Sequence, residues 1–326
     1  MKRMRLITRR MLLVVFCFAK TASSQRALNW AIRVSDLEAT LNFTTSVLGM
    51  KTLRHEENDK PCPIKRNGGY DTRWSRTMVG YNREDSAYAL ELTYNYGVGA
   101  YEKGQGLDAF RVVLDSVVER SDVASSLGYA VKYASNGVRH ITGPDGYEFT
   151  LVPKHHGNGG HDREEPFSTV VLRTRDPNKM AAFYKSFFGM KGMMMMALDP
   201  LDTVHVVGFQ EHSVRFAIAG LQKPPKITQW EGRNTISLPE KAVRELNRRL
   251  LEEAPELILH ELREVEEKLG ILLILTLRDP AGYEVCVVSS ETFDDAVGYV
   301  TDYQGPDWDL RTSLHEQHYF GAKDEL

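Results

Sequence analysis

Two stretches of the chain, GPDGYEFTLVP at residues 143–153 and DPAGYEVCVVS at residues 279–289, have nearly the same pattern and lie 136 positions apart. In both, proline and glycine favour a tight turn, and a tyrosine then opens an apolar run that is typical of a buried strand. A second matching pair, LNFTTSVLGMK at 41–51 and AAFYKSFFGMK at 181–191, is offset by 140 positions. Because two independent pairs give almost the same offset, we infer that the chain contains an internal duplication.

Each half of the duplication combines helices with short strands. In the first half, a strand at 28–34 precedes a helix that begins with the capping box SDLE, in which Ser35 is the cap. In the second half, a strand at 167–174 precedes a helix that is capped by Asp176 and ended by Gly189. A strand, a helix and three strands occur twice within one half, so we predict about four such units in the whole chain.

The segment LILHELREVEEKL at 257–269 gives conflicting signals. Its apolar residues recur at helical spacing, whereas its place in the repeat requires a strand. We follow the repeat and predict a strand at 256–263, because tertiary context can override local helix propensity.

The composition is that of an ordinary globular protein, with 326 residues, of which 42% are hydrophobic and 26% are charged. This length allows two domains with substantial cores. The formal net charge is −3, and five of the cations lie within the first ten residues. An acidic balance of this kind argues against nucleic acid and anionic lipid as partners.

Both ends of the chain have features of targeting signals. Residues 1–24 combine a cationic start, an apolar run at 11–19 and small residues, as a secretory signal peptide does. That run is too short to span a bilayer, so we expect no integral membrane segment in the mature chain. The last four residues, KDEL at 323–326, are an address for the retrieval receptor of the endoplasmic reticulum. We therefore predict the lumen of the endoplasmic reticulum, with another secretory compartment or a secondary plastid as the alternative.

Three stretches resemble the glyoxalase I family of the vicinal oxygen chelate (VOC) superfamily: RVSDLEATLNFTTSVLGMK at 33–51, LELTYNYGVGAYEKG at 90–104 and GPDGYEFTLV at 143–152. The resemblance implies an α+β fold of tandem glyoxalase-like (VOC) domains, in which two βαβββ units per domain form a half-open, U-shaped sheet. The domains that follow are 26–153 and 167–290, with a linker at 154–166 and a tail at 291–326.

The resemblance also implies a metal site, because working members of this family hold a divalent metal with four side chains on the concave face of the sheet. In the first half these positions fall on Asn29, Glu91, Ala109 or Phe110, and Thr150. Glu91 is the metal ligand and catalytic carboxylate that the family pattern predicts, and Asn29 is a weak metal candidate. In the second half the positions fall near Thr169, Ala217, Arg233 and Cys286. Neither set is complete for zinc, nickel, cobalt or manganese.

We therefore expect a glyoxalase-like protein of the secretory pathway with degenerate metal sites, which binds a small organic ligand or a docking partner. We expect no tightly held cofactor, and binding of a divalent metal is the alternative. The candidates for a ligand pocket are Tyr94, Trp74 and Arg76. A structural aromatic cluster under a long loop is the other interpretation of these residues. For Glu91, the other interpretation is an ion pair with a neighbouring lysine or arginine.

Two other functions are consistent with the sequence. One is a metal-dependent lyase of the lactoylglutathione lyase type, acting on a 2-oxoaldehyde–glutathione adduct. The other is a non-catalytic scaffold. Cys62 and Cys286 lie in opposite halves and are expected to be free or buried thiols, with a disulfide in an oxidising lumen as the alternative.

Overall fold

The computed structural model describes residues 25–154, 165–193, 204–210, 213–268 and 270–298. The expected leader, most of the linker and the tail beyond residue 298 lie outside these ranges. Within them, no helix is both long enough and apolar enough to cross a membrane.

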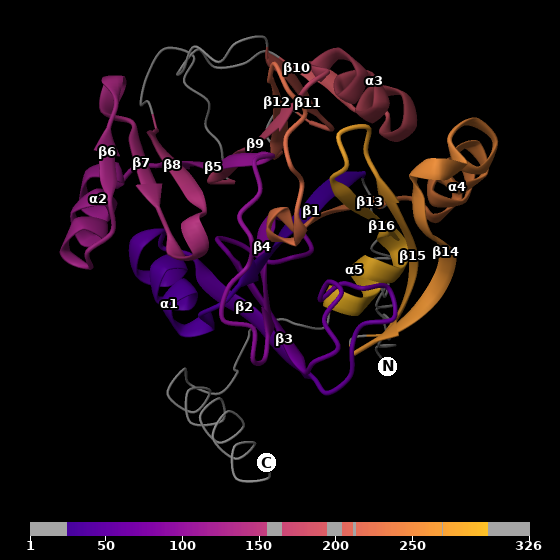
Figure 1. The fold of residues 1–326 in the computed structure, drawn as a ribbon, viewed down its shortest axis with the longest axis horizontal. Coiled ribbons are helices and arrows are strands. Elements are labelled where there is room, and N and C mark those ends of the chain that lie inside the picture. The colour runs from indigo at the N-terminus through magenta and orange to yellow at the C-terminus, as the bar shows by residue number, and fades with distance from the viewer. Residues whose placement is uncertain (1–24, 155–164, 194–203, 211–212, 269, 299–326) are drawn as a thin grey trace, which may run out of the picture.

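Four βαβββ units follow one another along the chain (Figure 1). The first contains β1 (Arg26–Val34), α1 (Leu37–Asn42) with its π-helical extension η1 (Phe43–Val47), β2 (Lys51–Asn58), β3 (Trp74–Gly80) and β4 (Ala89–Asn95). The second contains β5 (Leu107–Leu114), α2 (Val117–Ser126), β6 (Val131–Tyr133), β7 (Arg139–Thr142) and β8 (Glu148–Pro153). The third contains β9 (Phe167–Thr174), α3 (Pro177–Phe188), β10 (Lys191–Met193), β11 (Val204–Gly208) and β12 (Arg215–Gly220). The fourth contains β13 (Arg233–Leu238), α4 (Glu240–Glu253), β14 (Ile258–Glu267), β15 (Gly270–Arg278) and β16 (Glu284–Ser289), and α5 (Ser290–Gly298) follows it.

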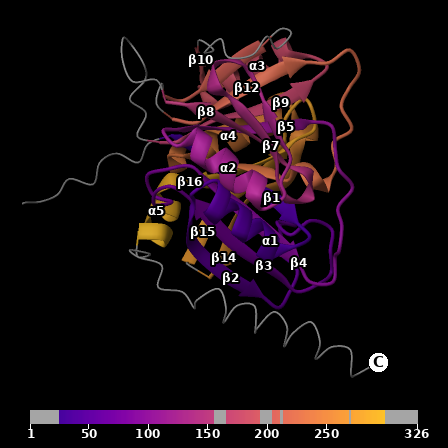
Figure 2. The ribbon, with the colours of Figure 1, turned by 90° about the vertical axis from the view of Figure 1, so that its left-hand side faces the viewer.

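The strands form two eight-stranded sheets. Sheet A has the order β14-β15-β16-β13-β1-β4-β3-β2, and sheet B has the order β10-β11-β12-β9-β5-β8-β7-β6. Figure 2 shows sheet B towards the top of the molecule and sheet A towards the bottom. The predicted architecture of paired βαβββ units in curved sheets is confirmed, and the conflicting segment at 257–269 contributes the strand β14, as the repeat predicts.

The units that share a sheet differ from the sequence-based expectation. Each half of the duplication, 26–153 and 167–290, contributes one unit to each sheet, so sheet A combines the first and fourth units and sheet B the second and third. The reason lies in the central strands. β5 pairs with β8 on one side and with β9 on the other, and β1 pairs with β4 and with β13 in the same way. A duplication identifies repeated units, but it does not determine which copies pair.

Two segments carry the chain from one sheet to the other, at 96–106 and 221–232. They lie side by side, because the backbone N–H of Gln105 donates to the carbonyl oxygen of Lys226 at 2.9 Å. The two crossings therefore support each other and tie sheet A to sheet B.

A continuous apolar core lies between the two sheets and their helices. Trp30 of sheet A is fully buried in it and makes edge-on ring contacts with Phe110 of sheet B, at 6.4 Å between centroids, and with Tyr283, at 6.3 Å. Each such pair contributes about 0.5–1.5 kcal/mol beyond the burial of its area. The core occupies one face of each sheet, which leaves the opposite face of each sheet for a site.

The helix caps agree with the sequence-based expectation in the second half and differ in the first. In α3 the cap is Asp176 and the last turn ends at Gly189, as predicted. In α1 the cap is Asp36, and the expected cap Ser35 is wrong. The Ser35 hydroxyl donates instead to the Asp145 carboxylate in the turn GPDGY, so it joins the first unit to the second.

Candidate functional site

The concave face of sheet A is the face that points away from the shared core, and it receives every second side chain of each strand. Two segments cover it, namely residues 59–73 between β2 and β3, which we call the covering loop, and helix α5 (Figure 1). Ile64 of the loop and Phe293 of α5 form one small apolar cluster with Cys286 of β16. The concave face of sheet A is therefore closed by the chain itself.

Glu91 of β4 lies on this face and is only 1% exposed. It forms an ion pair with Arg66 of the covering loop, with 3.0 Å between Glu91 Oε2 and Arg66 Nη1. Burial alone would raise the pKa of Glu91, but the positive charges of Arg66, Arg76, Arg54 and Arg33 outweigh burial and hold the pKa below its ordinary value. Glu91 is thus an ionised carboxylate whose counter-ion is an arginine, which is the second interpretation given to it from the sequence.

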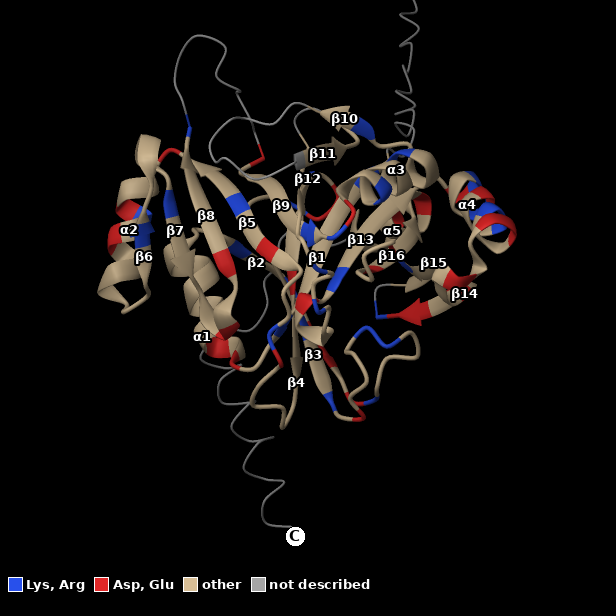
Figure 3. Cartoon of the chain, turned by 45° about the horizontal axis from the view of Figure 1, so that its top comes forward, with Lys and Arg blue, Asp and Glu red and all other residues tan. Residues whose placement is uncertain are grey.

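Two of the arginines near Glu91 have further carboxylate partners. Arg76 of β3 pairs with Glu56 at 2.5 Å and with Glu267 of β14 at 3.1 Å. Arg54 of β2 pairs with Glu84 at 3.0 Å and also with Glu56. These charges are buried, whereas the positive and negative residues of α4 alternate on the outside of the molecule (Figure 3). The buried network is structural, because removing one partner would leave an uncompensated buried charge, at a cost of about 3–5 kcal/mol.

Arg33 of β1 differs from these arginines, because no ion pair joins it to a carboxylate among the described residues. Arg33 is only 2% exposed, and neither its Nε nor its Nη1 has a hydrogen-bond partner among the described residues. Burial and the nearby positive charge of Arg233 lower the pKa of Arg33, while the negative charges of Glu284 and Glu91 oppose this shift. A buried guanidinium without a hydrogen-bond partner is costly, so Arg33 is a candidate for binding an anion.

Other polar groups lie around Arg33. The Tyr101 hydroxyl accepts a hydrogen bond from Asn95 Nδ2 at 3.0 Å. Burial raises the pKa of Tyr101, while this hydrogen bond and the positive charge of Arg33 oppose the rise. Arg233 Nη1 is another buried donor without a partner among the described residues. We call Arg33, Arg233, Asn95 and Tyr101 the anion site.

The covering loop is held in place by specific contacts. Arg233 Nη2 donates to the carbonyl oxygens of Ile64 and Lys65 at 3.0 and 3.1 Å. Lys65 has a φ of +52°, which is uncommon for a residue other than glycine. The Asn67 side chain donates to Asn95 Oδ1 at 3.1 Å, and Asn95 Nδ2 donates back to the Asn67 carbonyl oxygen at 3.0 Å. These contacts fix the position of Arg66 on the concave face.

The divalent metal that the family resemblance implies does not fit the residues of sheet A. Because the first and fourth units share this sheet, the ligand positions carry Asn29, Glu91, Arg233 and Cys286. The Glu91 carboxylate is already paired with Arg66. Burial raises the pKa of the Cys286 thiol, which favours the neutral form of that side chain. Asn29 offers only a neutral amide oxygen. Within the described ranges, no three histidine, cysteine or acidic side chains are arranged to hold a metal ion.

The same positions on sheet B offer no metal ligand either. They carry Thr150, Thr169, Ala217, and Ala109 or Phe110. Val171, Val206 and Ala217 form a small apolar cluster on sheet B, separate from the large core. The two sheets therefore differ chemically, and the charged face of sheet A is the candidate functional site.

Four of the residues proposed from the sequence come together on the concave face of sheet A, namely Glu91, Asn29, Trp74 and Arg76. Asn29 is 4% exposed, and its Oδ1 has no partner among the described residues. Trp74 is 3% exposed, and its indole N–H donates to the carbonyl oxygen of Lys60 at 3.0 Å. Trp74 thus supports the covering loop and is not a free pocket wall.

Tyr94 is not on the concave face, which corrects its assignment to the ligand pocket. It lies in the large core, with its ring 5.0 Å from that of Tyr96. The reason is the alternation of side chains along β4, because Tyr94 lies three positions after Glu91 and so points to the opposite face. The same alternation could have identified Arg33, which is four residues from Asn29 on β1. No local signal in the sequence indicates that Arg66 folds back onto Glu91.

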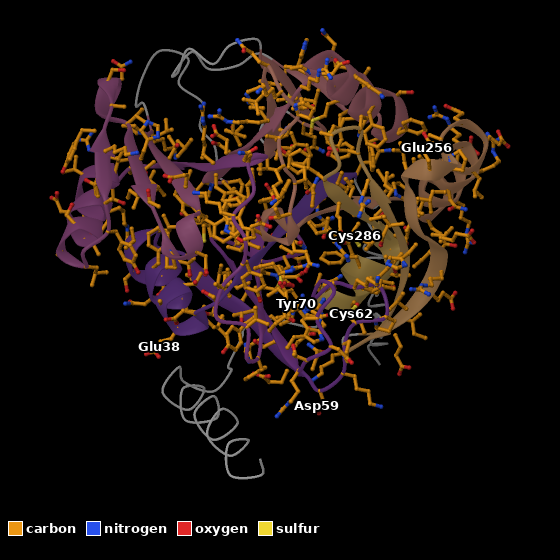
Figure 4. All side chains as sticks on the ribbon, in the orientation of Figure 1. Glu38, Asp59, Cys62, Tyr70, Glu256 and Cys286 are labelled. Carbon is orange, nitrogen blue, oxygen red and sulfur yellow. The ribbon has the colours of Figure 1, made fainter. Side chains whose placement is uncertain are left out.

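The two cysteines of the described chain lie close to this site. Cys62 is on the covering loop and Cys286 is on β16 (Figure 4), and both pack against the same apolar cluster. Both are free thiols, as the sequence analysis expected.

Comparisons with known proteins place the chain in a family. The family model for the glyoxalase/bleomycin resistance protein/dioxygenase superfamily matches residues 27–161. Glyoxalase 1 of Caenorhabditis briggsae is 32% identical to the chain over 274 residues, which cover 83% of this chain and 90% of that protein. The chain therefore belongs to the glyoxalase/bleomycin resistance protein/dioxygenase superfamily.

A further relative and a solved structure are also similar to the chain. Glyoxalase domain-containing protein 4 of Mus musculus is 28% identical over 271 residues, which cover 83% of this chain and 87% of that protein. The crystal structure of glyoxalase I from Zea mays has the same fold, with a TM-score of 0.68, 23% identity, and coverage of 86% of this chain and 98% of that chain.

Proposed function

We propose that the protein binds a small organic anion at the anion site on sheet A and that it does so without a resident metal. The observation that carries the proposal is Arg33, a buried arginine with two N–H groups that have no partner among the described residues. A carboxylate is the ligand group that suits it best, because hydrogen bonds from a charged guanidinium to an ionised carboxylate are about twice as strong as neutral ones.

The surrounding residues favour a ligand that has polar groups besides the carboxylate. Arg233 Nη1 is a second buried donor, and the Tyr101 hydroxyl and the Asn95 amide add neutral hydrogen-bonding groups. Tyr70, whose ring lies edge-on to Tyr101 with 5.6 Å between centroids, adds apolar surface next to them. Such a site would bind a small carboxylic acid or the carboxylate end of a peptide conjugate.

The alternative is a metal-dependent lyase of the lactoylglutathione lyase type that acts on a 2-oxoaldehyde–glutathione adduct. The name glyoxalase 1 of the nematode relative favours it, and such an adduct carries carboxylates that would suit Arg33. Against it stands the arginine on Glu91, the position at which the family pattern requires a metal ligand. A non-catalytic scaffold is the third candidate, and it predicts that no small carboxylate binds.

The test is calorimetric titration of the purified protein with acetate, D-lactate, pyruvate and glutathione, together with a glutathione whose carboxylates are amidated. We expect at least one carboxylate to bind with a Kd below about 1 mM and the amidated compound to bind at least about tenfold more weakly. Arg33→Met should lose this affinity.

Arg173→Met is the matched control. Arg173 occupies the position on β9 that corresponds to Arg33 on β1, but it is more exposed and pairs with Asp108 at 2.7 Å. The control should keep the affinity for the carboxylate. The proposal is wrong if none of the carboxylates binds, or if Arg33→Met binds them as tightly as the unchanged protein. Turnover of the adduct of methylglyoxal and glutathione after loading with zinc, nickel, cobalt or manganese would favour the lyase instead.

We further propose that the protein works in the lumen of the endoplasmic reticulum, because of the leader-like residues 1–24 and the sequence KDEL at 323–326. Deletion of the last four residues is expected to release the protein into the medium of expressing cells. Retention of the shortened chain inside the cells would contradict this location.

A further inference from the structure

The side chain that faces Glu91 comes from the covering loop and not from a neighbouring strand of sheet A. Arg66 belongs to the covering loop, yet only 6% of it is exposed, and its Nη1 lies 3.0 Å from Glu91 Oε2. The position of Glu91 on β4 is the one for which the family pattern predicts a metal-ligating carboxylate. In this chain the positive charge next to that carboxylate is a guanidinium.

Arg66 is charged in this environment. Burial alone would lower the pKa of Arg66, but the negative charges of Glu91 and Glu267 outweigh burial and raise it. The contact therefore joins two ions, and a charge-assisted hydrogen bond of this kind is about twice as strong as a neutral one.

Contacts on both sides of Arg66 hold the covering loop so that this charge lies next to Glu91. Arg233 binds the backbone of Ile64 and Lys65 immediately before Arg66, and Asn67 immediately after it is bonded to Asn95 of β4. Anchors on both sides hold the arginine over the sheet. Lys65 accepts a left-handed backbone conformation, which persists only where surrounding contacts require it.

We propose that Arg66 is the resident cation of this site and takes the place of the divalent metal next to Glu91. The inference deepens the proposed function and, for its ligand, rests on it: Arg66 Nε is buried and has no partner among the described residues, so it is a donor that an oxygen of the bound anion can use. Because the cation is part of the chain, the site needs no metal to neutralise Glu91, and the Glu91 carboxylate is already paired.

The experiment compares Arg66→Ala, Arg66→Lys, Glu91→Gln and the double variant Arg66→Ala/Glu91→Gln. Arg73→Ala is the matched control, because Arg73 is an arginine on the same loop whose partner Asp59 is 80% exposed. The midpoint of thermal unfolding and the affinity for glutathione are measured with no addition, with about 20 mM methylguanidinium, and with an equimolar amount of Zn²⁺ or Ni²⁺.

Arg66→Ala is expected to unfold several degrees below the Arg73→Ala control and to bind glutathione at least about tenfold more weakly. Methylguanidinium should recover a large part of both losses in Arg66→Ala alone, whereas Zn²⁺ and Ni²⁺ should recover neither. Arg66→Lys should lie between the unchanged protein and Arg66→Ala. The double variant should be more stable than Arg66→Ala, because it contains neither of the two buried charges.

Three results would overturn the proposal. Recovery by Zn²⁺ or Ni²⁺ would mean that Arg66 blocks a working metal site. An unfolding midpoint of Arg66→Ala equal to that of Arg73→Ala would mean that Glu91 does not need this cation. If Arg66→Ala does not fold, a double variant that also fails to fold or gains no stability would exclude the Arg66–Glu91 pair as the cause. Each result is independent of the Arg33→Met titration, so this inference and the proposed function can fail separately.

Discussion

The hydroxyl of Tyr147, which lies in the turn directly before β8 of sheet B, is bonded to both backbone groups of Arg33 in sheet A. It lies 2.9 Å from the carbonyl oxygen of Arg33 and accepts from the N–H of Arg33 at 3.1 Å. The second copy of the turn does the same with the sheets exchanged, because the Tyr283 hydroxyl donates to the Arg173 carbonyl oxygen at 2.8 Å and accepts from its N–H at 3.2 Å. The repeated sequence GPDGY and DPAGY therefore has a structural purpose, since each copy fastens one sheet to the first strand of a unit in the other.

The first prediction concerns these two hydroxyl groups. Tyr147→Phe and Tyr283→Phe should each lower the free energy of unfolding by about 1–3 kcal/mol, because each leaves buried backbone groups unpaired. Tyr147→Phe should also weaken carboxylate binding, since it loosens the backbone of Arg33, whereas Tyr283→Phe should not. Urea unfolding and calorimetric titration measure the two effects. Equal affinities in the two variants would contradict this positioning role of Tyr147.

A second prediction separates the roles of the arginines. Without ligand, Arg33→Met should increase the free energy of unfolding by about 1–3 kcal/mol, because it removes a buried charge that forms no ion pair and keeps an apolar stem of similar length. The same substitution at Arg66 should be destabilising. Urea unfolding of both variants tests this contrast, and a loss of stability in Arg33→Met would show that Arg33 is compensated in the free protein.

Gly232 provides a third prediction, because it lies directly before β13 and against β1. Its φ is +72°, and a Cβ atom there would lie 1.7 Å from the carbonyl oxygen of Ala31. Gly232→Ala should therefore cost about 4 kcal/mol or more and displace Arg233. Gly97, with a φ of +80° and no atom near its Cβ position, is the matched control, and Gly97→Ala should cost only about 1–2 kcal/mol. Similar losses in urea unfolding for the two variants would contradict this close approach of β13 to β1.

Asp279 leads to a prediction about pH. Burial raises the pKa of Asp279 from 3.8 to about 7, although hydrogen bonds from the backbone N–H groups of Tyr283 and Ala281 and from the Tyr184 hydroxyl oppose the rise. Because the folded-state pKa is the higher one, the stability that the protonated carboxyl contributes is present below pH 4 and is lost as the pH rises through about 7. The loss amounts to about 4 kcal/mol at most.

The variant Asp279→Asn removes this titration. Its amide oxygen can still accept from the backbone, so between pH 4 and 8 its stability should change less with pH than that of the unchanged protein. Urea unfolding at several pH values measures the difference. Parallel stability curves for the two proteins would mean that Asp279 titrates near its ordinary value.

The units of the fold could be predicted from the sequence, but their pairing could not. The spacing of repeated turns and helix ends gives four βαβββ units, and it gives β14 even where local periodicity favours a helix. The choice of partners depends on how β5 contacts both β8 and β9, which is a long-range property without a local signal. The cap of α1 was mispredicted for a similar reason, because Ser35 contacts Asp145, which is far away in the sequence.

The candidate site was predictable in part. The family pattern identified Glu91, and strand alternation places Asn29, Arg33 and Arg76 on the same face. That alternation excludes Tyr94, which was proposed as an aromatic residue of the ligand pocket. Arg66 could not be predicted, because it reaches Glu91 through a loop that has no regular periodicity.

The most direct test of the account is the metal content of the protein, purified without chelators and without a histidine tag, measured by elemental analysis. The account predicts less than about 0.1 equivalents of zinc, nickel, cobalt and manganese together, because Glu91 is already neutralised by Arg66. About one equivalent of any of these metals per chain would contradict it. In that case Arg66 would have to leave Glu91 in the working protein, and metal-dependent lyase activity would become the leading function.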